Sequence, residues 1–349
     1  MKTQKIYNML PSVLLPWYEE NKRDLPLRCD RDPYHIWVSE IMLQQTRVEA
    51  VKGYYSHFLE RIPTIEELAS ADDDLLHKLW EGLGYYSRVR NLKKAATVIM
   101  DRFDGVFPRN YEDVLSLPGI GEYTAGAICS IAFGQKTPAV DGNVLRVIAR
   151  LTNDDTSIDL PAMKKSVGQS LAQIYPENAG EFTQALMELG ATICGPNRQP
   201  DCENCPCKAF CKGYQHGTAQ SLPVRTPKKS RKIEEKTVFI LSCDGYYAVD
   251  KRPEAGLLAG LWQFPNIPGK HEVPHIISIL EQDGVHIKEL LRQVEKKHIF
   301  THVQWDMCGV YMEVSNKHSR YQWFTKEQIN RDIGLPTAFR QFWEEIDFV

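Results

Sequence analysis

Four cysteines lie close enough together in the chain to share a metal centre. They are Cys194, Cys202, Cys205 and Cys211, with gaps of seven, two and five residues between them. Thiolates crowded in this way usually bind a zinc ion or an iron–sulfur cluster. The spacing alone leaves both open, and free thiols or disulfides are a third possibility. Cys207 falls inside the same stretch and is a fifth thiol that could replace one of the four.

Two carboxylates occupy positions that suit catalysis. Glu40 follows Trp37 by three residues, which places it on a largely apolar face of a predicted helix. Burial there would raise the pKa of the carboxyl group and make it a general acid near neutral pH. Periodicity alone favours a water-exposed glutamate at the edge of that face. Asp141 precedes the apolar run 144–151, where an ordinary helix cap is the simpler interpretation.

A glycine-containing turn at residues 117–121 stands before another helix-forming stretch. Gly119 and Gly121 would let the backbone approach a phosphate group, and the following helix N-terminus would supply free N–H donors. Such a contact positions nucleic acid without reading its sequence. A turn of this kind is weak evidence when it stands alone.

Taken in order, this turn, Asp141 and the four-cysteine loop resemble the endonuclease III superfamily of helix-hairpin-helix DNA glycosylases. The stretches 37–46 and 82–88 resemble the MutY family of adenine DNA glycosylases within it, and the C-terminal part resembles MutT. The resemblance covers nearly the whole chain. It implies a 4Fe–4S cluster on the four cysteines. The first cysteine gap has seven residues where the family pattern has six.

The resemblance also assigns catalytic roles. Glu40 would protonate the adenine, and Asp141 would stabilise the positive charge that develops on the sugar when the glycosidic bond breaks. Asn143 would hold that carboxylate or a nearby water molecule. Tyr123 stands where related lyases have a lysine, and tyrosine cannot form a Schiff base. We therefore expect a monofunctional glycosylase, although a packed tyrosine at the start of a helix is the plainer alternative.

Further residues match the family's contacts to DNA and to the extruded base. Gln45 and Tyr85 match side chains that wedge into the duplex when a base is flipped out. Core packing is the alternative for Tyr85, but neighbouring glycines favour an exposed turn. Leu27 replaces a tryptophan of the family and keeps only an apolar wall. Arg28 follows it and is predicted to bind substrate.

The C-terminal part resembles MutT without its catalytic residues. No Arg-Glu-x-x-Glu-Glu sequence follows Gly256, so this part should bind and not hydrolyse nucleotides. Phe300, Thr301 and His302 resemble the loop that recognises 8-oxoguanine, with Thr301 in place of the usual serine. Without the resemblance, His298 and His302 would be interpreted as structural.

Composition limits the class of protein. The chain has 349 residues, 43% of them hydrophobic, and a net charge of −3, so nucleic-acid binding must be local. Residues 88–94 and 225–236 are local basic candidates, although a solvated face is the usual meaning of such runs. Nine cysteines without a secretory leader indicate a reducing compartment, and we expect a cytoplasmic, nucleoid-associated protein. No apolar stretch of about 18 residues is present, so no membrane helix is expected.

The hydrophobic period changes along the chain. Helical spacing runs through residues 1–216, for example over 65–79, whereas strand-like alternation begins after a proline-containing, charged segment. We predict a multi-domain protein: an all-α helix-hairpin-helix glycosylase with an iron–sulfur loop, and a C-terminal α+β Nudix-like domain. Its predicted parts are a helical domain at 1–216 (six-helix part about 30–136, iron–sulfur part about 1–29 and 137–216), a linker at 217–235, and a lesion-recognition domain at 236–349.

The function expected from this resemblance is base excision repair. A monomer would bind double-stranded DNA with adenine opposite 8-oxoguanine or G, flip the adenine out, and hydrolyse its N-glycosidic bond with acid assistance. The rivals are a lyase acting on damaged pyrimidines, against which Tyr123 argues, and a DNA-binding iron–sulfur protein without enzymatic activity, against which Glu40 and Asp141 argue. A nucleotide pyrophosphatase is excluded by the missing catalytic sequence.

Overall fold

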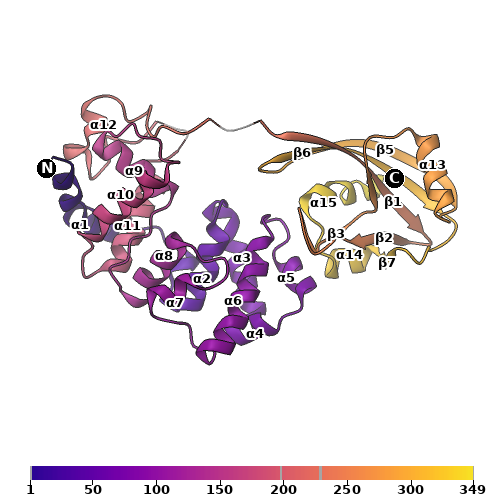
Figure 1. Ribbon diagram of the computed structural model, residues 1–349, viewed down its shortest axis with the longest axis horizontal. Coiled ribbons are helices and arrows are strands. Elements are labelled where there is room, and N and C mark those ends of the chain that lie inside the picture. Colours follow the sequence, from indigo (N-terminus) through magenta and orange to yellow (C-terminus); the bar gives the residue numbers. More distant parts are fainter. Residues whose placement is uncertain (1, 197–198, 228–229, 349) are drawn as a thin grey trace. The chain divides into compact units, whose positions relative to one another are not determined.

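The computed structural model describes residues 2–196, 199–227 and 230–348, and the chain divides into two compact units (Figure 1). Unit 1 contains Met1–Ser70 and Asn91–Pro227, and unit 2 contains Ala71–Arg90 and Lys228–Val349. Packing thus assigns residues 71–90, which lie inside the predicted helical domain, to the unit that contains the C-terminal part. In the described residues, no helix is long and apolar enough to cross a membrane.

Unit 1 is helical throughout its described part, as predicted. Its elements are α1 (Lys2–Asn21), η1 (Pro26–Arg28), α2 (Pro33–Leu43), α3 (Val48–Arg61), α4 (Ile65–Ser70), most of α6 (Ser87–Phe103), α7 (Tyr111–Leu115), α8 (Glu122–Phe133), α9 (Gly142–Thr152), α10 (Pro161–Ala172), α11 (Ala179–Thr192), η2 (Lys208–Phe210) and α12 (Lys212–Gln215). Helix α1 continues through Pro11 and Pro16. The predicted helix at 65–79 is wrong, because Asp72 caps a new helix, α5 (Asp73–Leu79).

Helix α11 is at the centre of unit 1 and packs against α1, α8 and α9, while α2 packs against α8. The shared core of α1, α9 and α11 includes Leu10, Leu14, Val144 and Phe182, all fully buried. Gly126 on α8 permits one close contact, since a Cβ atom there would lie 2.2 Å from the carbonyl oxygen of Pro138. This packing brings α2, α8, α11 and the start of α9 together around one cavity.

Helices α7 and α8 form the predicted hairpin. Gly119 in its turn has φ +78°, and a Cβ atom there would lie 2.6 Å from Cβ of Asn91. Glycine is therefore required at this position. Gly121 has an ordinary φ of −103° and open space at its Cβ position, so its backbone conformation does not require glycine.

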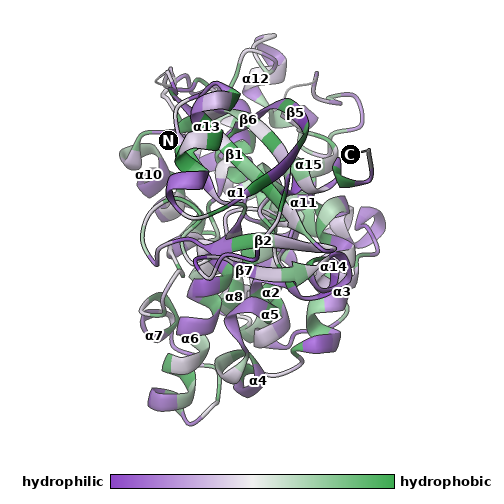
Figure 2. Cartoon of the chain, turned by 90° about the vertical axis from the view of Figure 1, so that its right-hand side faces the viewer, coloured by the Kyte–Doolittle hydropathy of each residue, from purple (hydrophilic) through white to green (hydrophobic). Residues whose placement is uncertain are grey.

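Unit 2 is built on a mixed sheet with strand order β3-β2-β1-β6-β5, with β4 paired to β1 and β7 to β2. The strands are β1 (Lys232–Cys243), β2 (Tyr246–Lys251), β3 (Trp262–Gln263), β4 (Asn266–Pro268), β5 (Ile287–Ile299), β6 (Val303–Val314) and β7 (Gln322–Thr325). Strands β1 and β6 are parallel, and the other pairs are antiparallel. Figure 2 shows the hydrophobic residues along β1, whose centre is buried. The helices are α13 (Val273–Gln282), α14 (Lys326–Asp332) and α15 (Thr337–Trp343), followed by η3 (Ile346–Phe348).

Helix α5 belongs to unit 2 through specific contacts. Asp74 accepts a hydrogen bond from the indole nitrogen of Trp262 at 3.0 Å, and Glu81 accepts one from the backbone N–H of Leu335 at 3.1 Å. A Cβ atom on Gly334 would lie 3.0 Å from the backbone of His77, so the two chain segments are in close contact. These contacts explain why residues 71–90 pack with residues 228–349.

The segment between the helices and the sheet is only partly a linker. The backbone N–H of Ile158 donates to the carbonyl of Val224 at 3.1 Å, so the residues before Pro227 are bound to unit 1. Strand β1 begins at Lys232 because residues 232–235 pair with residues 303–306 of β6. Residues 228 and 229, which fall within the predicted linker, lie outside the described residues.

Candidate active site

Glu40 on α2 is buried, with 5% of its surface exposed, so the water-exposed alternative is wrong. The hydroxyl group of Tyr123 on α8 donates a hydrogen bond to its Oε2 at 2.7 Å. Burial raises the pKa of Glu40 to about 7; the Tyr123 hydrogen bond opposes this, the charge of Asp141 adds to it, and Arg28 opposes it. A large fraction of Glu40 is therefore protonated at neutral pH, as a general acid requires.

Asp141 does cap helix α9. Its Oδ1 accepts hydrogen bonds from the backbone N–H groups of Asn143 and Val144 at 2.9 and 2.8 Å, and its Oδ2 accepts one from Nδ2 of Asn143 at 2.5 Å. Burial raises the pKa of Asp141, and these hydrogen bonds oppose the rise. The carboxylate is thus held in one orientation at the helix N-terminus, and capping is compatible with a role toward substrate.

A buried arginine connects Asp141 to the cysteine loop. Arg146 donates to Oδ1 of Asn143 at 3.0 Å and to the backbone carbonyl of Cys194 at 2.9 Å. Arg150, one turn further on α9, donates to the sulfur of Cys194 at 3.3 Å. Both arginines are 4% exposed. The loop and the capped aspartate are therefore parts of one hydrogen-bonded structure.

One cavity of about 900 Å³ joins the predicted catalytic residues. Glu40, Tyr123, Asp141, Asn143 and Arg28 all line it. Leu27 also lies on its wall and is 9% exposed, which agrees with the apolar wall expected there. A cavity of this size suits a small ligand or a single nucleotide.

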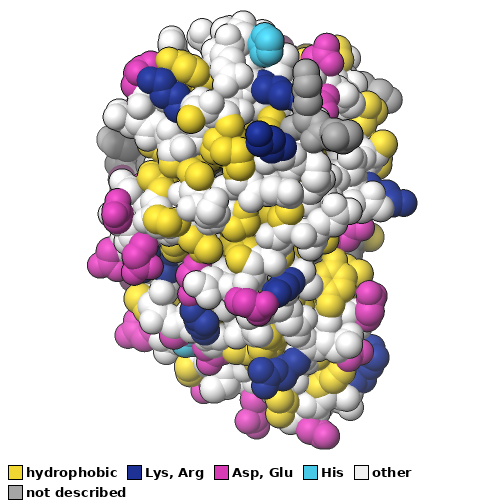
Figure 3. Space-filling model, turned by 90° about the vertical axis from the view of Figure 1, so that its left-hand side faces the viewer, with side chains coloured by type: hydrophobic (Ala, Val, Ile, Leu, Met, Phe, Trp, Pro, Cys, Tyr) yellow, Lys and Arg dark blue, Asp and Glu magenta, His cyan; other side chains and the backbone are white. Residues whose placement is uncertain are grey.

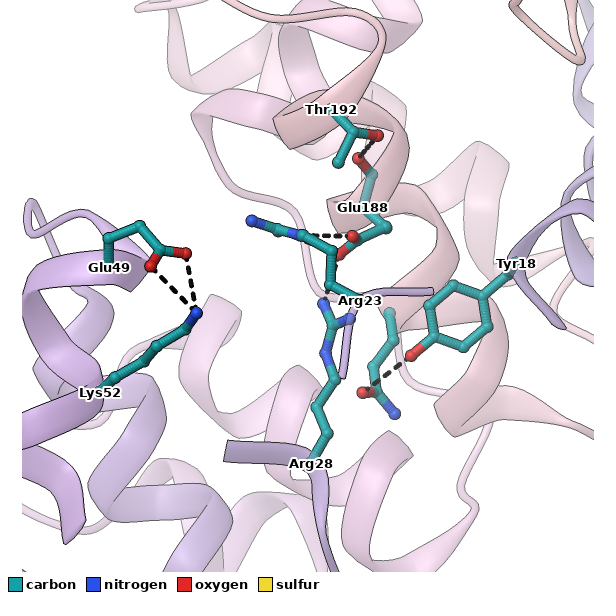
Figure 4. Close-up of polar contacts among 8 residues, drawn as sticks. Tyr18, Arg23, Arg28, Glu49, Lys52, Glu188 and Thr192 are labelled. Carbon is teal, nitrogen blue, oxygen red and sulfur yellow. Dashed lines mark hydrogen bonds and ion pairs between the residues drawn. The ribbon is translucent and has the colours of Figure 1, made fainter. Parts of the chain in front are cut away.

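A charged cluster on the cavity side was missed by sequence reasoning. Glu188 on α11 is completely buried and pairs with both Arg23 and Arg28, as Figure 4 shows. The available signal was a glutamate inside the apolar stretch 185–189. Charged residues are seldom fully buried unless they are paired, so this glutamate could have been singled out but its partners could not.

The four predicted metal-binding cysteines line a second, small cavity, together with Arg150. Cys207 is fully buried in the adjoining core and is not among the residues lining it. Within the described part of the chain, no three His, Cys, Asp or Glu side chains are arranged to hold a single metal ion. Residues 197 and 198, in the long first gap, lie outside that part. Four thiols around one cavity are a donor set that fits an iron–sulfur cluster.

The predicted wedge residues both occupy strained, exposed positions. Gln45 has φ +59° and Tyr85 has φ +47°, and 47% of Tyr85 is exposed, so the core-packing alternative for Tyr85 is wrong. Such conformations are uncommon for residues with side chains and often mark functional sites.

The predicted lesion-reading residues form the turn between β5 and β6. The ring of Phe300 packs against those of His298 and Trp305, at centroid distances of 4.5 and 4.8 Å. Thr301 and His302 are exposed. Within unit 2, the hydroxyl groups of Thr301 and Tyr85 lie 3.1 Å apart.

The predicted basic surface at 88–94 is wrong for its first member. Arg88 is 7% exposed, stacks on Trp80 and Tyr85, and donates to the carbonyl of Leu83. Arg90 donates to the carbonyl of Ala259 at 2.7 Å. On the face drawn in Figure 3, basic side chains are interspersed with acidic and hydrophobic ones.

Comparisons with known proteins agree with this geometry. A model of the HhH-GPD superfamily of base excision DNA repair proteins matches residues 38–173, and a NUDIX domain model matches residues 237–345. Among solved structures, a thermostable thymine-DNA glycosylase is 31% identical with a TM-score of 0.56, covering 62% of this chain and 100% of its own. An endonuclease III–DNA complex, 22% identical with a TM-score of 0.53 over 62% of this chain and 98% of its own, supports the fold alone.

Curated relatives are more similar and match both units. The adenine DNA glycosylase of Rattus norvegicus is 34% identical over 95% of this chain and 73% of its own length. That of Homo sapiens is 33% identical over 94% and 72%, and that of Buchnera aphidicola (Baizongia pistaciae) 32% over 93% of both chains. The chain belongs to the adenine DNA glycosylase family.

Proposed function

We propose that this protein removes adenine from mispairs in double-stranded DNA, as a monofunctional glycosylase in base excision repair. One observation carries the proposal: a buried, protonatable Glu40 and a capped Asp141 line the same cavity. Tyr123 is hydrogen-bonded to Glu40, and Asn143 is hydrogen-bonded to Asp141. An acid for the leaving base and a carboxylate for the sugar are the two groups that glycosidic cleavage needs.

The reaction follows from these positions. An adenine flipped into the cavity takes the proton of Glu40 on a ring nitrogen, which lets the base leave with the bonding electrons of its N-glycosidic bond. Asp141 stabilises the positive charge left on the sugar. A water molecule then adds to the sugar and gives up a proton, for which the Glu40 carboxylate is the nearby base. Free adenine and an abasic site are the products.

The absence of a lysine at position 123 supports hydrolysis without strand cleavage. Tyr123 donates its hydroxyl proton to Glu40, and burial raises its pKa far above the ordinary value, so it stays neutral. Lys22 lines the rim of the cavity but pairs with Glu19 at 3.5 Å. Borohydride trapping with an adenine-containing duplex tests this: wild type should form no trapped complex, and a trapped complex would favour the lyase rival.

We assign recognition of 8-oxoguanine to the turn that carries Thr301. Its exposed hydroxyl group can donate or accept a hydrogen bond, and the preceding residue, Phe300, is held by two aromatic contacts. A specific hydrogen bond to a base edge supplies discrimination of about 1–3 kcal/mol.

We further propose that Cys194, Cys202, Cys205 and Cys211 hold a 4Fe–4S cluster. When bound, such a cluster supplies a rigid anionic cross-link of the loop. Arg150 is placed to donate to one ligand sulfur, and Arg146 transmits the loop's position to Asn143 beside Asp141. The loop's contribution to catalysis is thus positional.

Single-turnover excision decides among the functions. Duplexes with adenine opposite 8-oxoguanine, adenine opposite G, or a damaged pyrimidine are compared with excess enzyme. We expect adenine release from the first two and none of the pyrimidine. Release of the pyrimidine alone would contradict the proposal, as would DNA binding without release of any base.

A further inference from the structure

We propose that Glu188 is a positioning residue for base removal, which holds the guanidinium group of Arg28 on the wall of the catalytic cavity. The inference rests on the proposed function and adds a residue that acts through another. Its basis is the cluster of the buried Glu188 with the partly exposed Arg23 and Arg28. Both arginines line the cavity with Glu40 and Asp141, but the cluster takes no part in the reaction described above.

The two carboxylate oxygens of Glu188 accept different numbers of hydrogen bonds from the two arginines. Oε1 of Glu188 accepts from Nε of Arg23 at 2.5 Å, whereas Oε2 accepts from Nη2 of Arg23 at 3.1 Å and from Nη2 of Arg28 at 2.8 Å. Figure 4 shows both guanidinium groups directed at this one carboxylate. Glu188 belongs to α11, whereas both arginines belong to the segment between α1 and α2, so the carboxylate joins two parts of the cavity wall.

The orientation of Arg28 is determined from two sides. Glu188 binds the edge of its guanidinium group, and the ring of Tyr18 lies 5.7 Å from its central carbon. Tyr18 is itself oriented, since its hydroxyl group donates to Oε1 of Gln184 at 3.2 Å. A planar guanidinium held at its edge and against a ring has little freedom to turn.

The cluster contains more positive than negative charge. Two guanidinium groups share one carboxylate, and their hydrogen bonds and charges keep the pKa of Glu188 below its ordinary value despite burial. The net positive charge faces a cavity that contains Glu40 and Asp141. Removal of Glu188 would therefore leave Arg28 without its anchor on the cavity wall, where its charge acts on Glu40.

Arg28 also has a donor that the protein leaves unsatisfied. Its Nη1 is buried and has no hydrogen-bond partner among the described residues. Buried donors are nearly always paired, so an exception calls for an explanation. With Nη1 unpaired, the protein holds this guanidinium group by the hydrogen bond from Nη2 to Glu188. Stability alone explains the cluster poorly, because buried ion pairs contribute little net stability compared with apolar residues of similar size.

Glu188→Gln is the direct test, because it keeps the shape and removes the charge. We expect the single-turnover rate of adenine release to fall between about 10- and 100-fold, the effect of misplacing a group at an active site. Affinity for a duplex with a non-cleavable adenine analogue should change less than about threefold, since phosphate contacts dominate affinity. Glu188→Asp, which restores the charge, should recover part of the rate.

A double-mutant cycle shows whether Glu188 acts through Arg28. Glu188→Gln should have little further effect on the rate in an Arg28→Gln background, because the group that it positions is already gone. If the rate losses of the two single substitutions add fully in the double variant, the proposal is overturned. A wild-type rate in folded Glu188→Gln would also overturn it. The matched control is Glu177→Gln, which removes an exposed glutamate paired with Lys136 away from the cavity; its rate should equal that of wild type.

Failure of the proposed function and failure of this inference give different experimental results. If wild type releases no adenine, the proposed function fails; if wild type is active and Asp141→Asn is not, an unaffected Glu188→Gln refutes this inference alone. Should Glu188→Gln fail to fold, Arg28→Lys gives the same decision, because lysine keeps the charge and loses the planar fork. A reduced rate with unchanged DNA affinity then supports the proposal, and a wild-type rate overturns it.

Discussion

The hydroxyl group of Tyr123 lies 2.7 Å from Oε2 of Glu40 and joins helix α8 to helix α2 inside the cavity that Glu40 and Asp141 line. The hydrogen bond stabilises the ionised carboxylate and so lowers the pKa of Glu40, while burial raises it more strongly, to about 7. Tyr123 thus adjusts the acid at which the proposed reaction begins.

The rate of adenine release should depend on the protonation of Glu40. Only the protonated acid can donate, so the single-turnover rate should fall as the pH rises through about 7. Tyr123→Phe removes a hydrogen bond that lowers this pKa, so its rate profile should shift to higher pH. Rates of both proteins are measured from pH 5 to 9 on one duplex. A shift to lower pH, or no shift, would contradict the role given to Tyr123.

Glu40 should also make the fold less stable at high pH. The ordinary pKa of a glutamate is 4.5, whereas burial raises the pKa of Glu40 to about 7, so the folded state binds more protons than the unfolded state between these values. Stability from this group therefore falls as the pH rises through that window. Glu40→Gln should raise the thermal unfolding temperature relative to wild type at pH 8, and the difference should shrink toward pH 5. A difference independent of pH would show that titration of Glu40 is not responsible.

Asp141→Asn should abolish adenine release and spare DNA binding. Asparagine is as good a helix cap as aspartate, so helix α9 should keep its stability while the charge that stabilises the sugar cation is lost. A barrier increase of roughly 3 kcal/mol or more is expected, by analogy with lost oxyanion-hole donors. Single-turnover rates and duplex affinity are measured together. A near-normal rate would show that Asp141 only caps helix α9.

Purified protein should be yellow-brown, with broad absorbance near about 400 nm from thiolate-to-iron charge transfer. Cys202→Ser should lose this colour because it removes a ligand. Cys207→Ser is the matched control and should retain it, since Cys207 is buried in the core beside the loop. Colourless protein with one equivalent of zinc would exclude the cluster.

Thr301→Val should reduce the preference for 8-oxoguanine over G without slowing cleavage opposite G. The hydroxyl group is lost and the size is kept, so a discrimination loss of about 1–3 kcal/mol is expected. Tyr85→Phe is the control, because it removes the same 3.1 Å contact and leaves the Thr301 hydroxyl in place. Rates on the two mispairs are compared for each protein. Equal losses in both variants would assign the discrimination to the hydroxyl pair and not to Thr301 alone.

Local patterns were sufficient wherever a residue's neighbours in the chain decide its structure. Helical spacing predicted the helices of unit 1. The β1–β2 turn is equally local, since Asp244 and Gly245 both have positive φ there and are residue types that favour such turns. The prediction failed where one residue changes the local outcome, as at Asp72, whose side chain caps a new helix. Strand β1 likewise begins early because β6, far away in the chain, supplies hydrogen-bonding partners for residues 232–235.

By itself the sequence determined the types of chemical group: a potential acid at Glu40, a capping carboxylate at Asp141, and four clustered thiols. The tertiary structure decided what surrounds them. Burial and the Tyr123 hydroxyl determine the pKa of Glu40, and Glu188 meets Arg23 and Arg28 from more than 150 residues away in the chain. Charge interactions, burial and hydrogen bonding depend on distances in space. Spacing along the sequence gives those distances only for residues within the same helix or strand.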